Sequence, residues 1–244
     1  MPAPASSPRG GGAVPVADPK GVVFEKVTHF FGDRTVLRNV SLVLTQRRVA
    51  VLGANGSGKS TLARMINGLV LPESGVVRVD GLDTRHAARK VRRNVGFVFT
   101  DPDRQILMPT VAEDIELSLS RLGLSRGERA ARTRVVLERF GLADHADHPA
   151  HLLSGGQKQL LALASVLVTE PRIVVADEPT TLLDLRNARM MREAFATLDV
   201  QLIVVTHDLA LIEDFDRVVV LEEGEIHADD APAPALAAYR RLMR

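Results

Sequence analysis

Cysteine is absent from this chain of 244 residues. Its absence excludes disulfide bonds, cysteine zinc sites and thiol nucleophiles, and it is compatible with a reducing compartment such as the cytosol. An excess of charge is also missing, because 31 basic and 30 acidic residues leave a formal net charge of +1. A surface that binds nucleic acid has a strong basic excess, so we do not expect that function. No apolar run approaches the roughly 20 residues that cross a bilayer, so we expect no membrane-spanning segment.

The remaining composition, 45% apolar and 25% charged, is that of a globular chain with a sizeable core, as one large domain or two small ones. The first 20 residues differ, because they are rich in proline, glycine and alanine and lack the apolar centre of a signal peptide. We expect residues 1–20 to form a disordered N-terminal tail. Residues 231–244 are expected to form either a short helix or a frayed tail.

Short β-branched runs predict strands in both halves of the chain. These runs are VVFEKV, SLVL, VAVLG, VVRVD, VGFVF, IVVADE, LIVVTH and VVVL. The runs IVVADE and LIVVTH are apolar on both faces and flank a helical segment at 185–198, as expected for parallel strands covered by crossover helices. The pattern therefore predicts an α/β core.

The middle of the chain, about residues 108–168, has a helical pattern instead. Two capping boxes begin at Thr110 and Ser125, and glycines 123 and 141 stand where helices are expected to end. The apolar residues Ile115, Leu119 and Leu122 recur at helical spacing, so we expect them to face the core together. This segment is predicted to be a helical insertion in the sheet.

A phosphate-binding loop is the strongest motif of the sequence. It combines two glycines five residues apart with a following lysine and serine, and it lies between a predicted strand and a predicted helix. Backbone N–H groups and a helix N-terminus can then converge on phosphate oxygens. The ammonium of Lys59 is expected to reach the outer phosphates and the hydroxyl of Ser60 to coordinate Mg²⁺. The alternative is a glycine-rich turn with a chance lysine. The predicted phosphate-binding residues are Gly53, Ala54, Asn55, Gly56, Ser57, Gly58, Lys59, Ser60 and Thr61.

Two later strands end in residues that can perform chemistry. Asp177 and Glu178 close IVVADE, at the strand end where ligands bind open parallel sheets. We expect Asp177 to hold Mg²⁺ through its water shell and Glu178 to polarise an attacking water. The pair could instead end the strand and cap the next helix. His207 follows LIVVTH and is either a catalytic residue or, as is common for a lone histidine, a structural or solvated one.

The residues Leu153-Ser-Gly-Gly-Gln157, between the helical insertion and Asp177, resemble the signature of ATP-binding cassette (ABC) ATPases. The resemblance extends over about residues 22–227. It implies a P-loop NTPase (RecA-like) core with an N-terminal antiparallel β-subdomain and an inserted α-helical subdomain, over residues 21–230. It also implies ATP and Mg²⁺ as cofactors and Phe31 as the aromatic residue that stacks on adenine. Phe30 is the alternative, and both rings could instead belong to the core.

The same resemblance implies a second ABC ATPase subunit as partner, expected to be another copy of this chain. In the family, Ser154, Gly155, Gly156 and Gln157 cap the ATP that the other subunit holds, and the glycines permit close backbone approach. Asp184 resembles the loop that joins the two sites, and His207 resembles the histidine that senses the terminal phosphate. Glu178 then becomes the catalytic base.

One position departs from the family pattern. Family members usually have a glutamine in the loop after VGFVF, where it contacts Mg²⁺ and couples the site to membrane subunits, whereas this chain has Thr100. Threonine lacks the amide and is shorter, so it can reach the metal only through water or after the loop moves inward. Gln105 follows five residues later. Either hydrolysis is slow or coupling is arranged differently.

The segment TDPDRQ followed by PTVAED resembles ATPases of energy-coupling factor (ECF) importers, which take up vitamins and transition-metal ions. This implies two further partners, a transmembrane coupling subunit and a substrate-binding subunit, and a cytoplasmic location at the inner face of the membrane. The short C-terminal region favours biotin as the solute; cobalt, nickel or another vitamin is the alternative. An ATP-dependent dimerising regulatory or scaffold protein is a further alternative, favoured by Thr100 and opposed by Glu178 and His207. The basic run at 89–93 is expected to be a solvated segment.

Overall fold

The structure is a computed structural model that describes residues 20–243. The strands are β1 Val22–Phe31, β2 Arg34–Leu44, β3 Arg48–Leu52, β4 Ser74–Val79, β5 Leu82–Asp83, β6 Val95–Val98, β7 Ile173–Asp177, β8 Gln201–Val205, β9 Arg217–Glu222 and β10 Glu225–Asp230. The α-helices are α1 Lys59–Ile66, α2 Ala88–Asn94, α3 Val111–Leu119, α4 Arg126–Arg139, α5 Gly155–Leu167, α6 Leu185–Ala196 and α7 Pro232–Leu242. The predicted tail, apart from Lys20, lies outside the described residues.

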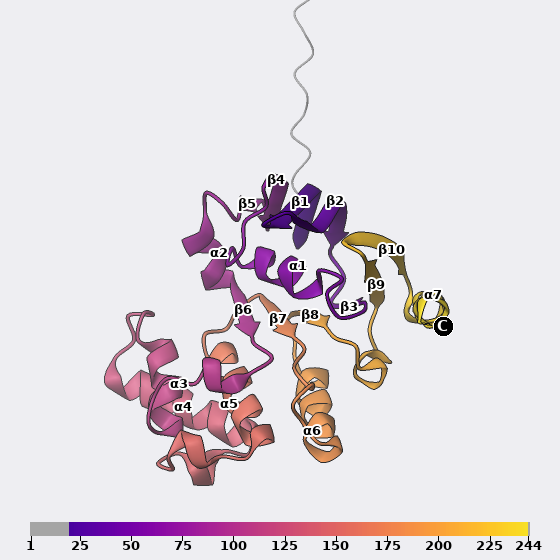
Figure 1. The fold of residues 1–244 in the computed structure, drawn as a ribbon. Coiled ribbons are helices and arrows are strands. Elements are labelled where there is room, and N and C mark those ends of the chain that lie inside the picture. Colours follow the sequence, from indigo (N-terminus) through magenta and orange to yellow (C-terminus); the bar gives the residue numbers. More distant parts are fainter. Residues whose placement is uncertain (1–19, 244) are drawn as a thin grey trace, which may run out of the picture.

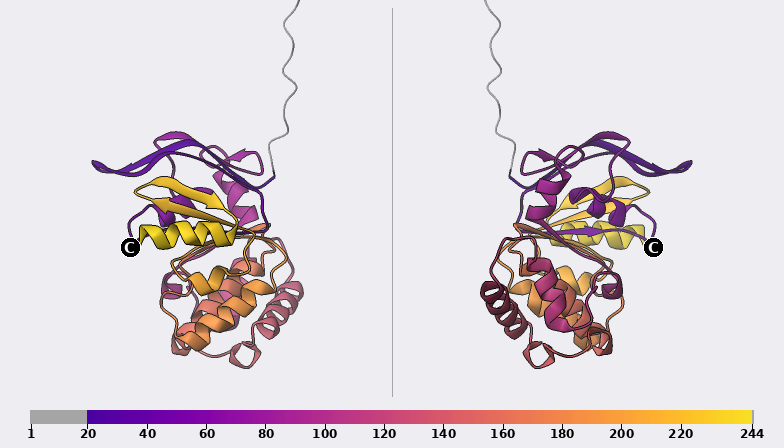
Figure 2. Two further views of the ribbon diagram at one scale, coloured as in Figure 1. Left: turned by 90° about the vertical axis from the view of Figure 1, so that its right-hand side faces the viewer. Right: turned by 90° about the vertical axis from the view of Figure 1, so that its left-hand side faces the viewer.

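The strands form two sheets that are stacked in Figures 1 and 2. The smaller sheet has the order β2-β1-β4-β5 and is antiparallel. The larger sheet has the order β10-β9-β3-β8-β7-β6, and all its strands are parallel except β10. Helix α1 lies between the sheets, and the helices of the insertion and α6 lie on the opposite side of the larger sheet (Figure 1). The predicted α/β core, N-terminal antiparallel β-subdomain and inserted helical subdomain are confirmed.

Alternation along the parallel strands explains why they are apolar on both faces. In β3, Val49 and Val51 belong to the core on the α1 side, whereas Ala50 and Leu52 belong to the core on the side of α5 and α6. All four side chains are fully buried. Each central strand therefore joins two hydrophobic cores, and its carboxyl end is held in place from both sides.

The helical insertion consists of α3, α4 and α5, between β6 and β7. Both predicted capping boxes are present, with Thr110 and Ser125 as N-caps of α3 and α4. Ile115 and Leu119 are buried as expected. The prediction for Leu122 is wrong, because α3 ends at Leu119 and the chain turns away, leaving Leu122 44% exposed.

The C-terminal segment adopts the helical alternative, as α7. It packs on β9, and Tyr239 is among its buried residues. Strand β10, which the sequence pattern did not predict, pairs with β9 at the edge of the larger sheet. Within residues 20–243, none of the helices combines the length and the apolar character needed to cross a bilayer.

Candidate active site

The predicted phosphate-binding loop connects β3 to α1. Gly58 is the N-cap of α1 with φ +103°, and a Cβ there would lie 2.6 Å from the carbonyl oxygen of Val36, so only glycine fits this position. The ammonium of Lys59 donates to the carbonyl oxygens of Gly53 at 2.9 Å and Ala54 at 3.0 Å. The side chain of Lys59 therefore folds back along its own loop, within reach of any group bound over the helix N-terminus.

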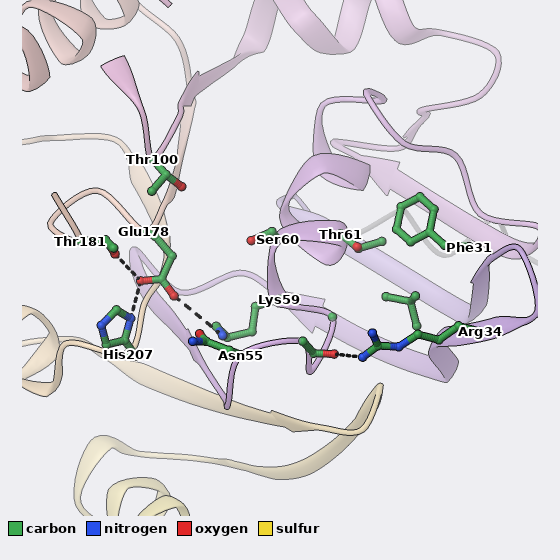
Figure 3. Close-up of a pocket in the computed structure, with 13 residues that line it drawn as sticks. Phe31, Arg34, Asn55, Lys59, Ser60, Thr61, Thr100, Glu178, Thr181 and His207 are labelled. Carbon is green, nitrogen blue, oxygen red and sulfur yellow. Dashed lines mark hydrogen bonds and ion pairs between the residues drawn. The ribbon is translucent and has the colours of Figure 1, made fainter. Parts of the chain in front are cut away.

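A cavity of about 370 Å³ opens beside this loop (Figure 3). It is lined by Phe31, Arg34, Val36, Asn55, Gly56, Gly58, Lys59, Ser60, Thr61, Thr100, Glu178, Thr181 and His207. Phe31 lies at one end and Glu178 with His207 at the other, and the phosphate-binding loop lies between them (Figure 3). Residues from five separate stretches of the chain thus meet around one elongated cavity.

Several predicted site residues do not line this cavity. Ala54 and Ser57 line a neighbouring pocket, and Asp177 lies behind Ser60 with 1% exposure. The signature residues 154–157 lie at the start of α5, outside the cavity. Their predicted role concerns the nucleotide of a second subunit, so this position neither supports nor opposes it.

Asp177 and Ser60 meet at the bottom of the site. The hydroxyl of Ser60 donates to Oδ1 of Asp177 at 2.7 Å, and Nη2 of Arg64 lies 3.4 Å from Oδ2. Burial raises the pKa of the Asp177 carboxyl, while the Ser60 hydrogen bond and the Arg64 charge act to lower it. A hydroxyl and a carboxylate are the oxygen ligands that Mg²⁺ prefers beside substrate phosphates, so these residues fit the metal.

Glu178 is held by residues from three directions. Its Oε2 contacts Nδ1 of His207 at 2.8 Å and accepts from the hydroxyl of Thr181 at 3.1 Å, and its Oε1 lies 3.8 Å from the Lys59 ammonium. Burial lowers the pKa of Lys59, and the nearby carboxylates of Glu178 and Asp177 oppose that change. The backbone of Glu178 is left-handed, with φ +51°. The alternative that the Asp177-Glu178 pair caps the next helix is wrong, because Asp184 caps α6.

Thr100 does line the cavity, next to the acidic pair. Its hydroxyl donates to the backbone carbonyl of Asp177 at 2.8 Å, so it is bonded to the chain rather than extended into the cavity. Gln105 has other partners: its side chain accepts from the N–H of Phe99 and donates to the carbonyl of Ala162, each at 3.1 Å. Gln105 therefore joins this loop to α5 and is not a substitute for the glutamine that the family usually has.

The two phenylalanines at the end of β1, Phe30 and Phe31, differ in position. Phe31 lines the cavity and is 58% exposed, whereas Phe30 is 41% exposed and is not among the lining residues. The ring of Phe31 contacts the edge of the buried His29 ring, with the centroids 4.8 Å apart. The two rings are therefore not simply core residues, and Phe31 is the one that lines the cavity.

Sequence reasoning missed three lining residues, Arg34, Val36 and Thr181. The Arg34 guanidinium donates to the Gly56 carbonyl at 3.3 Å, across the loop. Arg34 pairs with Phe31 in the β1–β2 hairpin register, and this pairing brings it to the cavity. Thr181 lies three residues after Glu178, but only the turn that follows β7 brings their side chains together.

The fold and the site together define a class of protein. A glycine-rich loop between a parallel strand and a helix, facing carboxylates at the end of the next strand but one in the same sheet, is the arrangement of P-loop nucleoside triphosphatases. The antiparallel sheet and the helical insertion narrow that class to ATP-binding cassettes.

Comparison with known proteins agrees. The ABC transporter family matches residues 37–181. A protein of Deinococcus radiodurans, named as an ABC transporter ATP-binding protein, is 55% identical over 89% of this chain and 96% of its own length. The biotin transport ATP-binding protein BioM of Rhizobium etli is 47% identical over 91% of this chain and 98% of its own length. The cobalt import ATP-binding protein CbiO of Syntrophus aciditrophicus is 41% identical over 84% of this chain and 75% of its own length. The energy-coupling factor transporter ATP-binding protein EcfA of Syntrophomonas wolfei is 39% identical over 89% of this chain and 83% of its own length.

Two solved structures have the same fold. One is cbiO1 of Clostridium perfringens, described as part of the ABC transporter complex cbiONQ, with a TM-score of 0.79, 30% identity, and coverage of 90% of this chain and 92% of that one. The other is the cassette MJ0796, described as a dimer in a post-hydrolysis state bound to ADP and Pi, with a TM-score of 0.74, 31% identity, and coverage of 86% and 98%. The chain belongs to the ABC transporter family, as an ATP-binding subunit of the energy-coupling factor type, and it is an ABC-type ATPase.

Proposed function

We propose that this chain binds ATP with Mg²⁺ in the cavity beside its phosphate-binding loop and energises the import of biotin. The observation that carries the proposal is the meeting of Ser60, Asp177, Lys59 and Glu178 in one site, at the end of buried strands. A scaffold protein without turnover would not need a carboxylate held by three partners within reach of the phosphate loop.

Each group has a role that its place supports. Phe31 stacks on adenine at one end, and backbone N–H groups of residues 53–58 with the Lys59 ammonium bind the phosphates. Ser60 and Asp177 hold Mg²⁺, which neutralises developing charge on the phosphate oxygens when bound. Glu178 accepts a proton from the attacking water at its carboxylate. His207, in contact with Glu178 at 2.8 Å, orients that carboxylate and is proposed to sense the terminal phosphate.

The functional unit is proposed to be a head-to-tail dimer of this chain, in which the signature residues 154–157 cap the other subunit's ATP. The cassette MJ0796, whose structure matches 86% of this chain, is described as a dimer. Membrane subunits then follow the opening and closing of the dimer at the inner face of the membrane. Biotin is favoured as the solute because the BioM protein of Rhizobium etli, at 47% identity, is more similar to this chain than the cobalt import protein, at 41%.

The variant Glu178→Gln tests the catalytic assignment. It should retain ATP-dependent dimerisation and lower turnover by about 10²–10⁴-fold, because the amide keeps the shape but cannot accept a proton. Glu170→Gln is the matched control, since Glu170 also has left-handed backbone (φ +56°), is exposed, and lines neither the cavity nor the pocket beside it. Unchanged turnover in Glu178→Gln contradicts the assignment.

The solute is tested by copurifying the chain with its membrane partners and measuring uptake of labelled biotin, with labelled cobalt and nickel ions in parallel. We expect biotin uptake that depends on ATP and is lost with Glu178→Gln. Uptake of a metal ion instead of biotin contradicts the solute and leaves the ATPase assignment intact.

A further inference from the structure

The two glycines of the signature turn, Ser154–Gln157, have opposite surroundings. Gly155 is exposed, and a Cβ added to it would meet open space. Gly156 is buried, and a Cβ there would lie 2.1 Å from Oδ1 and 2.7 Å from Cβ of Asn187. Overlap of this size cannot be accommodated unless one of the two segments shifts. The chain's own helix α6 therefore requires a glycine at position 156, before any approach by a second subunit is considered.

Asn187 is itself held in place. It is the third residue of α6, and its backbone N–H donates to Oδ1 of the N-cap residue Asp184 at 2.8 Å. The next residues inward, Ala188 and Met191, are buried against the core. The first turn of α6 thus has little freedom to move away from Gly156.

The signature turn is equally fixed on its own side. Ser154 caps α5 by accepting from the N–H of Gln157, and the Gln157 side chain accepts in return from the N–H of Ser154. One turn further, the buried Gln159 donates to the carbonyl of Phe99. Two capped helix starts, α5 and α6, therefore lie against each other where Gly156 faces Asn187.

We propose that Asn187 is a positioning residue that fixes the signature turn against the first turn of α6, so that Ser154 and Asp184 keep one spacing and move as a unit. Both of these residues are exposed, whereas Gly156 is buried and Asn187 is half-buried. The proposal rests on the function proposed above, in which the signature turn caps the ATP of a second copy. Such a cap needs its donors placed to within about 0.5 Å, which a loose turn cannot provide.

A compensating pair of substitutions tests the contact. Gly156→Ala places a methyl group on Asn187 and should speed amide hydrogen exchange in residues 155–159 and 185–190 together, by about 10- to 100-fold. Gly156→Ala with Asn187→Gly restores the space and should return exchange in residues 155–159 to within about threefold of the parent. Gly155→Ala is the matched control and should leave exchange unchanged, because its methyl group meets open space.

Asn187→Ala is a second, independent variant. It removes the amide atoms nearest Gly156 while alanine favours the helix α6. Exchange in residues 155–159 should rise by about fivefold although α6 itself is not weakened. A double variant no better than Gly156→Ala, or an Asn187→Ala variant with unchanged exchange at 155–159, overturns the proposal.

The role in function is tested by measuring ATP-dependent dimerisation of variants that also carry Glu178→Gln. Gly156→Ala should raise the ATP concentration needed for dimerisation at least tenfold, and the compensating Asn187→Gly change should recover most of that loss, with binding of ATP to the monomer unchanged throughout. Absence of rescue here overturns the role of Asn187 in positioning the cap. If the Glu178→Gln parent does not dimerise with ATP, the proposed function fails, while the exchange measurements still decide the contact.

Discussion

The carboxylate of Asp177 is almost completely buried, and its partners do not fully offset the free energy that burial of its charge costs. Its side chain is 1% exposed, its partners are a neutral hydroxyl and a half-exposed guanidinium, and burial raises its pKa. We predict that Asp177→Asn stabilises the protein when metal and nucleotide are removed, and that it abolishes the further stabilisation given by ATP with Mg²⁺. The same substitution should therefore change stability in opposite directions in the two conditions.

The magnitude follows from the balance of two terms. Burial of a carboxylate costs several kcal/mol, and hydrogen bonds to it return roughly 1.5–3 kcal/mol each. The Arg64 contact, at 3.4 Å from a side chain that is 45% exposed, belongs at the low end of that range. Since the pKa of Asp177 is raised, the cost exceeds the return. A gain on the order of 1 kcal/mol corresponds to about 2–4 °C in Tm for a chain of this size.

The pH dependence of stability is a second test of the predicted sign of the Asp177→Asn effect. A carboxyl group with a raised pKa in the folded protein contributes stability below its unfolded pKa, and that stability is lost as the pH rises through the folded pKa. The advantage of Asp177→Asn should be largest near about pH 7.5 and shrink towards about pH 4.5, as measured by thermal unfolding in a chelator. An advantage that does not depend on pH, or a lower Tm at neutral pH, refutes the reasoning.

Asp114 supplies the control for that experiment. It is also buried, at 4% exposure, but its carboxylate accepts from the N–H groups of Leu107 and Met108 and from the hydroxyl of Ser165, at 2.8 to 3.2 Å. Asp114→Asn replaces an acceptor by a donor facing these groups and should destabilise the protein by about 1–3 kcal/mol. The two buried aspartates are thus expected to respond with opposite signs.

Two further substitutions test the remaining assignments in the cavity. Thr100→Gln breaks the hydrogen bond to the Asp177 carbonyl and adds a longer amide side chain. It should therefore change the ATPase rate or the stimulation of that rate by membrane partners. If neither changes, this position takes no part in coupling. Phe31→Ala should weaken ATP binding by about tenfold or more, because stacking on a base is worth about 1–3 kcal/mol, and should leave binding of inorganic triphosphate unchanged. Phe30→Ala is its control, and an equal loss for both ligands contradicts the stacking role.

The sequence was sufficient where the signal is local. All eight β-branched runs lie in strands, and both capping boxes are present, because each depends on residues within one element. The phosphate loop was equally readable, since its glycines and lysine are contiguous. Leu122 shows the limit of periodicity: its spacing fits the helix, but α3 ends three residues earlier and a turn exposes it.

The contacts that sequence reasoning missed are those between distant parts of the chain. Strand β10 has no apolar alternation and exists because β9 offers an edge with which to pair. Arg34 reaches the phosphate loop only through the register of a hairpin. Asn187 faces Gly156 because two helix starts, some thirty residues apart, are brought together by packing. In the last case, the family resemblance supplied one reason for the glycine and the structure adds another.

The Lys59 ammonium donates hydrogen bonds to the carbonyl oxygens of Gly53 and Ala54, which belong to the loop that directly precedes Lys59. These hydrogen bonds stabilise the curved conformation of the loop, and the ammonium joins its two carbonyl groups. Binding of a phosphate is then an exchange of partners, in which the lysine turns from carbonyl oxygens to phosphate oxygens while the backbone N–H groups are already aligned. Little ordering entropy remains to be lost at that step, so affinity should depend mainly on the difference between the old and the new acceptors.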